Sequence, residues 1–220
     1  MADVRGSHRR GPHRIALPHK GALASGARRL LAAAGYDCGV PGERLHSFDR
    51  ANDTEFLHLR ARDVPRLVAE GVLDAGITGR DLAADADRPV VELLALGFGH
   101  ARVHYAAPPD FGTDVTGLQG RRVATALPRL TARDLAARGL NATVVEMSGA
   151  VELAVRLGIA DAVADVVDTG RTLAAHSLVT IGSPLIRSEA VLVCAPAAAA
   201  TPATWLLAER MLACLLPAAR

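Results

Sequence analysis

Aromatic residues are scarce in this chain, and several common sequence signals are missing. Only 3% of its 220 residues are Phe, Trp or Tyr. No basic stripe with interleaved aromatic side chains occurs, although that pattern is typical of nucleic-acid binding. No apolar run reaches membrane-spanning length, and the basic N-terminus lacks the apolar centre of a signal peptide. We therefore expect neither nucleic acid nor a membrane as a partner.

Cysteine is also sparse, and charge is nearly balanced. The three cysteines, Cys38, Cys194 and Cys214, are odd in number and widely spaced, which argues against a disulfide framework or a zinc site. The 25 Lys and Arg residues face 23 acidic residues, so no strong net charge points to a polyanionic partner. These features predict a protein of the reducing cytoplasm.

The most basic stretch is VRGSHRRGPHR at residues 4–14, with four arginines and two histidines. Its glycine, proline and charge content cannot build a core. We expect residues 1–13 to form a disordered basic tail.

Beyond the tail, apolar strands alternate with helices of roughly ten residues, a pattern that predicts an α/β fold with mostly parallel sheets. The region 36–53 contains proline, glycine and several charges, and reads as a loop. We expect two lobes with a cleft between them and hinges near 96–102 and 178–188. Lobe I would comprise residues 14–97 and 182–220, and lobe II residues 98–181. The predicted strands are 14–18, 55–59, 72–79, 90–95, 102–107, 122–126, 143–146, 162–167, 177–181 and 190–194.

The stretch 148–173, SGAVELAVRLGIADAVADVVDTGRTL, carries the strongest chemical signal. A strand at 162–167 leads into a loop whose main-chain amides and hydroxyls, with the start of the next helix, suit a phosphate. Carboxylates at Asp165 and Asp168 stand where ribose hydroxyls, or a magnesium ion attached to the sugar, would lie. An ordinary strand-turn-helix corner is the alternative. The loop residues are Asp168, Thr169, Gly170, Arg171 and Thr172.

A second candidate follows the first predicted strand, where Lys20 and Gly21 precede an alanine-rich helix. A lysine and a glycine at the carboxyl end of a strand are well placed to meet an anionic ligand. A plain strand-to-helix turn with a solvated lysine is the alternative here.

Five blocks in order give the sequence its resemblance to a known family. They are RIALPHKGAL, LRARDVPRLVAEGVLDAGITGRDL, VVELLALGFG, VATALPRLTARDLAARG and SGAVELAVRLGIADAVADVVDTGRTL. Over roughly residues 14–193 the chain resembles the catalytic part of ATP phosphoribosyltransferase, the enzyme that opens histidine biosynthesis. The resemblance implies a two-lobed fold of the type II periplasmic-binding-protein kind, with both substrates in the cleft. It also implies transfer of phosphoribosyl from 5-phosphoribosyl 1-pyrophosphate to N1 of ATP, with release of pyrophosphate.

The same resemblance assigns roles to residues. Asp168, Thr169, Gly170, Arg171 and Thr172 match the loop for the 5′-phosphate, with Glu152 and Asp165 beside the ribose hydroxyls. Lys20 and Arg44 fall at basic positions expected to act in catalysis. The nucleotide-binding positions are Lys20, Gly21, Thr78, Gly79 and Thr125. The resemblance implies Mg²⁺ carried by the substrate, with Asp165 as the candidate protein contact, and no organic cofactor.

Two departures from the family pattern keep alternatives open. Many family members have arginine where this chain has Ala22, and Glu43 stands directly before Arg44. A paralogue that serves a different acceptor and a non-catalytic ligand-binding protein of the same fold therefore remain alternatives. The chain matches a short form without the C-terminal regulatory domain, so the resemblance implies a homodimer and a separate regulatory subunit resembling histidyl-tRNA synthetase.

Overall fold

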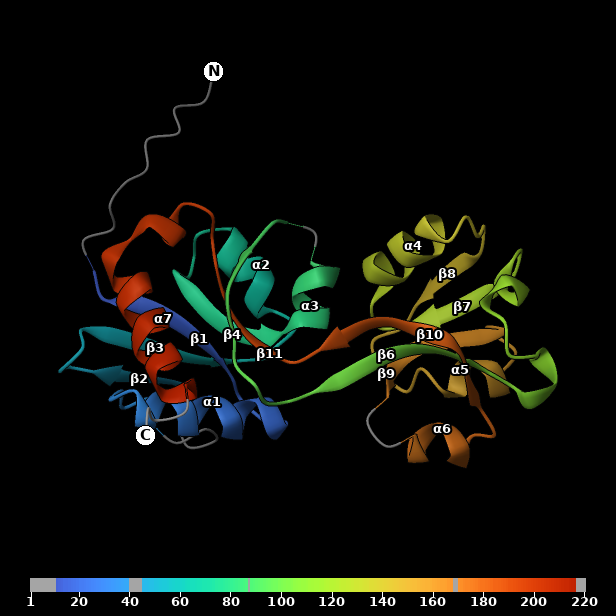
Figure 1. Ribbon diagram of the computed structural model, residues 1–220, viewed down its shortest axis with the longest axis horizontal. Helices are drawn as coiled ribbons and strands as arrows, with labels where there is room; N and C mark the ends of the chain where they lie inside the picture. Colours follow the sequence, from blue (N-terminus) through green and yellow to red (C-terminus); the bar gives the residue numbers. More distant parts are fainter. Residues whose placement is uncertain (1–10, 40–44, 87, 168–169, 217–220) are drawn as a thin grey trace, which may run out of the picture.

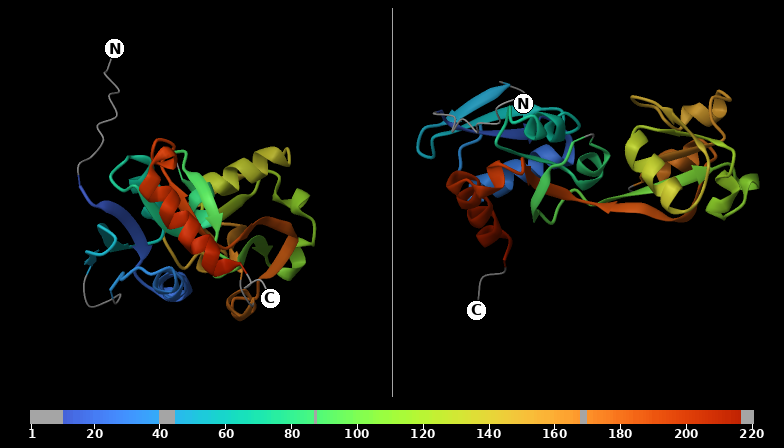
Figure 2. Two further views of the ribbon diagram at one scale, coloured as in Figure 1. Left: turned by 60° about the vertical axis from the view of Figure 1, so that its left-hand side comes forward. Right: turned by 90° about the horizontal axis from the view of Figure 1, so that it is seen from above.

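Two separate β-sheets, each flanked by helices, make up the molecule in our computed structural model (Figure 1). The structure describes residues 11–39, 45–86, 88–167 and 170–216. Viewed from above, the two bodies lie end to end and are joined by long strands (Figure 2). None of the helices in these described ranges is long and apolar enough to span a membrane.

The first sheet has six strands in the order β2-β3-β1-β4-β11-β5. Strands β1, β3 and β4 are parallel, so their carboxyl ends meet at one edge, whereas β2 and β11 run antiparallel to their neighbours. The bounds are β1 His13–Pro18, β2 His46–Asp49, β3 Thr54–Leu59, β4 Ala75–Gly79, β5 Val91–Ala95 and β11 Ala190–Cys194.

The second sheet has five strands in the order β10-β6-β9-β7-β8. Strands β7, β8 and β9 are parallel, while β6 runs antiparallel to both β9 and β10. Each sheet therefore has a parallel core, β3-β1-β4 in the first and β9-β7-β8 in the second, and is mixed because β2, β11 and β6 run antiparallel to their neighbours. The bounds are β6 Ala101–Ala107, β7 Arg122–Thr125, β8 Thr143–Glu146, β9 Ala162–Val167 and β10 Val179–Ser188.

Helices cover both faces of each sheet. Helices α1 and α7 pack on one face of the first sheet, and α2 on the other. In the second body, α4 lies on one face and α5 and α6 on the opposite face. The bounds are α1 Gly21–Ala33, α2 Val64–Ala69, α3 Arg80–Asp85, α4 Pro128–Ala137, α5 Leu153–Arg156, α6 Arg171–Ala175 and α7 Pro202–Leu215.

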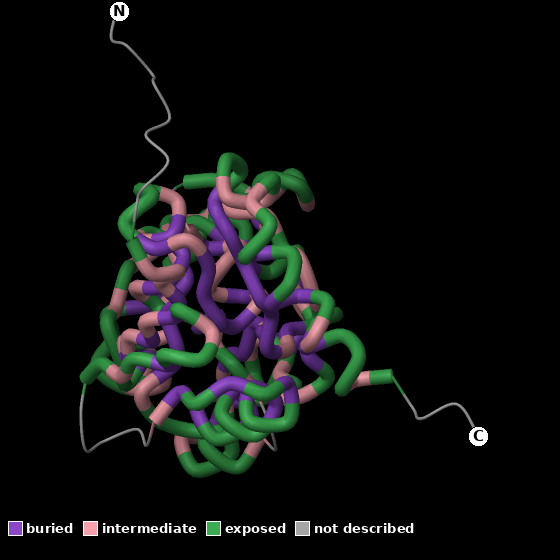
Figure 3. Tube along the Cα trace, turned by 90° about the vertical axis from the view of Figure 1, so that its left-hand side faces the viewer, coloured by how far each residue is buried: buried purple, intermediate pink, exposed green. Residues whose placement is uncertain are grey.

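The apolar strand sequences follow from this layering. Ile15 and Leu17 pack beneath α1, while Ala16 between them faces the cluster under α2. Alternate residues of a strand point to opposite faces, so a strand covered on both sides needs apolar residues throughout. Figure 3 shows the resulting arrangement, with buried segments inside and exposed segments around them.

Two of the three expected boundaries, at 13/14 and 181/182, lie within strands of the structure. Strand β1 begins at His13, the last residue assigned to the tail, and residues 1–10 lie outside the described ranges. Strand β10 stays in the second sheet as far as Ser188, well past residue 182, where lobe I was expected to resume. After a register shift between Ile181 and Ile186, β10 pairs again with β6.

On one face of β6 and β10, the bodies touch through α3 and α4. The carboxylate of Asp85 in α3 accepts a hydrogen bond from the Leu130 main-chain N at 2.8 Å. Arg62 Nη1 donates to the carbonyl oxygen of Ala126 at 2.6 Å. Leu82 of α3 joins Leu130 in an apolar cluster at the same place. We call these contacts, which join Arg62, Leu82 and Asp85 to residues 126–130, the closed side of the gap between the bodies.

Candidate active site

The exit of β1 places Lys20 at the edge of the first sheet. The main-chain N and ring Nδ1 of His19 lie 2.8 and 2.9 Å from the Leu59 carbonyl oxygen, which ties the ends of β1 and β3 together. Gly21 has φ of 78°, a value that favours glycine, and it begins α1. Lys20 therefore stands exposed at the helix start. Ala22, also exposed, follows in the first turn and supplies no charge.

The exit of β4 is more enclosed. Thr78 is fully buried, and its hydroxyl donates to the Ala61 carbonyl oxygen at 2.7 Å. At Gly79, a side-chain β-carbon would collide with the carboxylate of Asp81. Thr78 thus holds the loop before α2 in place, and Gly79 lets α3 begin close to the strand.

Thr125, the nucleotide-binding position expected in the second body, is also fully buried. Its Oγ1 accepts hydrogen bonds from Leu127 N at 2.9 Å and from the Thr131 hydroxyl at 3.2 Å. The side chain shapes the turn between β7 and α4, so any contact with a ligand at this position would come from the neighbouring main chain.

The predicted phosphate loop connects β9 to α6. Asp168 and Thr169 lie outside the described residues, as does Arg44. Gly170 has φ of 75° and precedes α6, whose first residues, Arg171 and Thr172, are exposed. A left-handed glycine before a helix turns successive main-chain amides toward one side, as phosphate-binding loops do.

Two carboxylates lie near this loop. Asp165 is half-buried on β9, and its Oδ1 accepts a hydrogen bond from Val166 N at 2.8 Å. Burial raises the pKa of Asp165 above its usual value, and the negative charge of Glu152 adds to the rise. Glu152 lies 3.9 Å from the ring of His176, which follows α6. The structure therefore brings Glu152 and Asp165 close to each other, and their contact with a ribose stays a prediction.

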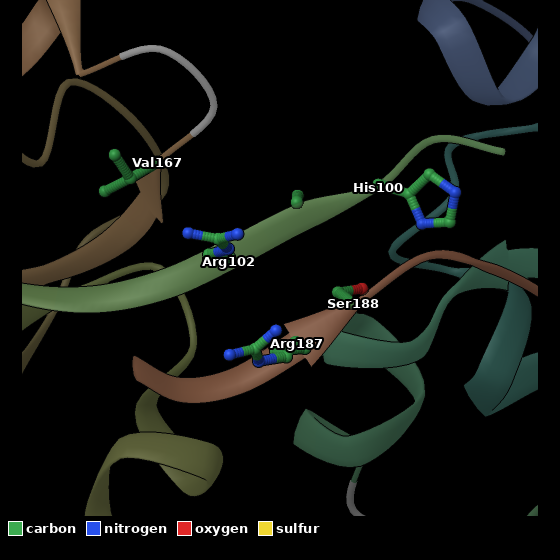
Figure 4. A pocket seen from close by; sticks show the side chains of 6 residues that line it. His100, Arg102, Val167, Arg187 and Ser188 are labelled. Carbon is green, nitrogen blue, oxygen red and sulfur yellow. The ribbon is translucent and has the colours of Figure 1, made fainter. Parts of the chain in front are cut away.

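A pocket of about 410 Å³ lies between the bodies at the junction of β6, β9 and β10 (Figure 4). Its lining residues are His100, Ala101, Arg102, Val167, Arg187 and Ser188. Val167 ends β9 and leads directly into the phosphate loop, so the pocket adjoins the predicted site. Among the described lining residues, Arg102 and Arg187 carry the permanent charges, and sequence reasoning missed both. Two arginines in separate strands give no motif, and only the strand register places them together.

The usual arrangement of a protein metal site is a cluster of several ligating side chains. Within the described ranges, no cluster of three or more His, Cys, Asp or Glu side chains is placed to hold a metal ion. Asp165 and Glu152 offer the hard oxygen donors that Mg²⁺ prefers.

The arrangement of two α/β bodies joined by crossing strands defines the class of protein. A solved histidine kinase sensor domain, described as similar to periplasmic binding proteins, aligns with a TM-score of 0.61 at 15% identity, over 95% of this chain and 91% of that one. A chain of the ATP phosphoribosyltransferase complex from Thermotoga maritima aligns with a TM-score of 0.74 at 24% identity, over 91% and 99%. The fold is that of the two-lobed, type II periplasmic binding proteins, and the fold class predicted from the sequence is confirmed.

Sequence comparison narrows the class to a family. The family model for ATP phosphoribosyltransferase matches residues 60–213. An ATP phosphoribosyltransferase of Mycolicibacterium gilvum is 50% identical over 180 residues, 82% of this chain and 64% of that protein. The chain belongs to the ATP phosphoribosyltransferase family, which confirms the resemblance seen in the sequence. It spans 64% of the length of this relative.

Proposed function

We propose that this chain is the catalytic part of an ATP phosphoribosyltransferase, joining N1 of ATP to C1 of 5-phosphoribosyl 1-pyrophosphate. The observation that carries the proposal is 50% identity over 180 residues to a protein of that name. The pocket at the end of β9 and the carboxylates beside it supply the geometry.

In the proposed reaction, the bond between C1 of the ribose and the pyrophosphate oxygen breaks, and pyrophosphate leaves with both electrons. The lone pair of adenine N1 forms the new bond to C1. N1 is already a nucleophile, so catalysis rests on positioning and electrostatics rather than on a strong base. Magnesium, when bound with the substrate, would offset part of the phosphate charge.

Residues of the second body would hold the sugar. The main chain at Gly170 and the side chains of Arg171 and Thr172, with Asp168 and Thr169, would bind the 5′-phosphate. Glu152 and Asp165 would accept hydrogen bonds from the ribose hydroxyls. A hydroxyl donor, or magnesium, in front of Asp165 would favour the charged carboxylate that burial opposes.

Residues of the first body would meet the nucleotide. Exposed Lys20 at the start of α1 would face the negative charge of the phosphates, with Gly21 letting the main chain approach closely. Thr78, Gly79 and Thr125 would act through the shape of their loops, because both threonine hydroxyls are already hydrogen-bonded within the fold. Arg44 keeps its proposed role as a second cation near the leaving group.

For assembly, we extend the proposal to a homodimer and to a separate regulatory subunit similar to histidyl-tRNA synthetase. The structural neighbour from Thermotoga maritima is a chain of a two-component complex, which supports a partner for this chain. Size-exclusion chromatography with light scattering would measure the mass of the chain alone and after mixing with such a subunit.

The test of function is product formation by the purified protein. Incubation with 5-phosphoribosyl 1-pyrophosphate, ATP and Mg²⁺ should yield phosphoribosyl-ATP and pyrophosphate in equal amounts, detected by mass spectrometry. Absence of product, with and without the regulatory subunit, would contradict the proposal.

Ala22 favours one alternative, transfer to a different acceptor, because the exposed first turn of α1 lacks the cation that many family members carry there. The same incubation with free nucleobases or other nucleotides in place of ATP distinguishes the two. If another acceptor reacts faster than ATP, that acceptor takes the place of ATP as the proposed substrate.

A further inference from the structure

The pocket between the bodies contains a pair of like charges in direct opposition. Arg102 on β6 and Arg187 on β10 are register partners in an antiparallel pair. Directly opposed residues have β-carbons about 4.5–5.5 Å apart and project from the same face of the sheet. Both side chains are exposed, and Figure 4 shows them on adjacent strands.

Like charges in this position destabilise a sheet unless something compensates them. Among the described residues, neither guanidinium makes a hydrogen bond or an ion pair with the protein. The described residues that line the pocket include no carboxylate. The pair thus presents positive charge to a cavity, and no described residue that lines it carries a compensating negative charge.

Within the described part of the chain, the neighbouring carboxylates Glu189 and Asp165 make no ion pair with either arginine of the pair, and each accepts hydrogen bonds from other groups. Glu189, next to the pocket-lining Ser188, accepts hydrogen bonds from Arg80 Nη1 at 2.9 Å and from Gly97 N at 3.0 Å. Asp165 of β9 is the register partner of His104, two residues along β6 from Arg102 and therefore on the same face of the sheet. Its carboxylate accepts a hydrogen bond from Val166 N. The positive charge of Arg102 reaches His104, whose pKa is lowered first by burial and then by this arginine.

The position of Arg102 and Arg187 limits which kind of anion they could bind. Arg102 is also the register partner of Val167, the residue immediately before the proposed phosphate loop. A row of Arg187, Arg102 and Val167 therefore crosses the sheet and ends at that loop. An anion held by both arginines would lie beside the sugar bound there, where a phosphate chain would extend from it.

We propose that Arg102 and Arg187 form a subsite for a phosphate chain, with His100 at its edge. Two planar guanidinium groups side by side supply paired donors to oxygens of adjacent phosphates. This subsite deepens the proposed function and rests on it for the identity of the chain. Two sources fit: the pyrophosphate group of 5-phosphoribosyl 1-pyrophosphate and the triphosphate of ATP.

The direct test is calorimetric titration of the purified protein with inorganic pyrophosphate. The double variant Arg102→Gln/Arg187→Gln should weaken binding by about tenfold or more, because each lost charge-assisted hydrogen bond is of that order. The matched control is Arg133→Gln, which removes one exposed arginine from α4 and should leave the affinity unchanged. Equal pyrophosphate affinity in the double variant and the control, or no binding to the wild type, would overturn the subsite.

Folding of the variants is checked separately. Arg187→Glu should keep the fold, because a glutamate opposite Arg102 replaces repulsion by attraction, and it should still lose pyrophosphate binding. A variant that binds pyrophosphate as tightly as the wild type despite this reversal of charge would also overturn the subsite.

Ribose 5-phosphate separates this inference from the proposed function, because it tests the loop at Gly170 without a pyrophosphate group. The double variant should bind it as the wild type does. Failure of the subsite would leave ribose 5-phosphate binding and product formation intact. If the proposed function is wrong, the wild type should form no product, but the double variant should still bind pyrophosphate more weakly than the wild type.

Steady-state kinetics then identify the source of the phosphate chain. A raised KM for 5-phosphoribosyl 1-pyrophosphate alone would place its pyrophosphate at the arginines. A raised KM for ATP alone would place the triphosphate there. Unchanged kinetic constants for both substrates would contradict a role in substrate binding.

Discussion

The two sides of the gap between the bodies are built in opposite ways. On the closed side, Asp85 of α3 accepts a hydrogen bond from Leu130 N in the first turn of α4, and apolar residues surround the contact. On the open side, a pocket is lined by Arg102 and Arg187, which have no partner within the described residues. One side satisfies its polar groups internally, and the other leaves charge for a ligand.

The closed side also shows how one body completes the other. Helix α4 has Leu127 at its N-cap position, with no side-chain cap of its own. Asp85 serves as that cap from across the gap, since it accepts from main-chain N–H groups of the first turn. This contact should stabilise the protein, whereas the open side should chiefly determine what it binds.

The largest expected effect concerns the open side. Gly170→Val forces a β-branched residue into a left-handed conformation with φ of 75°, although a β-carbon there meets no atom within 4 Å. We expect the loop to relax and binding of 5-phosphoribosyl 1-pyrophosphate to fall by about tenfold or more. Calorimetry measures the affinity.

Gly139→Val is the control for this change. Gly139 follows α4, has φ of 72° and is equally open around its β-carbon position. Both variants should lose about 1 kcal/mol or more of unfolding free energy, but only Gly170→Val should lose binding. Equal binding by the two variants would remove the loop from the site.

The second prediction concerns the closed side. Asp85→Ala removes the cap of α4 and should lower the free energy of unfolding by about 1–2 kcal/mol. Urea denaturation measures the change, with Asp110→Ala at an exposed position as the control. If the two variants are equally stable, the contact between α3 and α4 adds nothing to stability.

The pH dependence of the closed side sharpens the comparison. Burial raises the pKa of Asp85 in the folded protein, so its contribution is fully present below its unfolded pKa of about 3.8. That contribution is lost as pH rises through the folded value. The stability of the wild type relative to Asp85→Asn should therefore fall with rising pH in this range. Thermal unfolding of both proteins over a pH series measures this difference in stability. A difference that rises with pH would contradict the prediction.

The smallest effect should come from a surface pair outside the gap. Hydrogen bonds from Arg122 lower the pKa of Asp161 to about 2. Its contribution is present above the unfolded pKa and is lost as pH falls toward about 2. The stability of the wild type relative to Asp161→Asn should rise with pH, opposite in sign to Asp85→Asn. Solvent screening should keep this pH-dependent difference in stability small. A larger pH-dependent difference for Asp161→Asn than for Asp85→Asn would contradict the ranking of the two sites.

Much of the fold could be predicted because apolar strands and glycine-ended helices leave local signals. The predicted strand at 162–167, for example, is β9 as observed. Strand β2, by contrast, lies within the predicted loop at 36–53. Its sequence, HSFD, is short and polar, and it forms only because β3 offers an edge to pair with.

The candidate site could be predicted only where its residues are consecutive. The loop from Asp168 to Thr172 and the Lys20–Gly21 pair are visible as short motifs. The opposition of Arg102 and Arg187 depends on strand register, and the hydrogen bond from Leu130 N to Asp85 joins residues 45 apart. Such contacts arise from tertiary packing, which local sequence patterns do not encode.

A crystal structure with 5-phosphoribosyl 1-pyrophosphate and Mg²⁺ tests the central claim most directly. We predict that the 5′-phosphate will lie against the main chain at Gly170, with the ribose beside Asp165 and Glu152. Density for the sugar phosphate away from this loop, or none at saturating ligand, would contradict the assignment of the site.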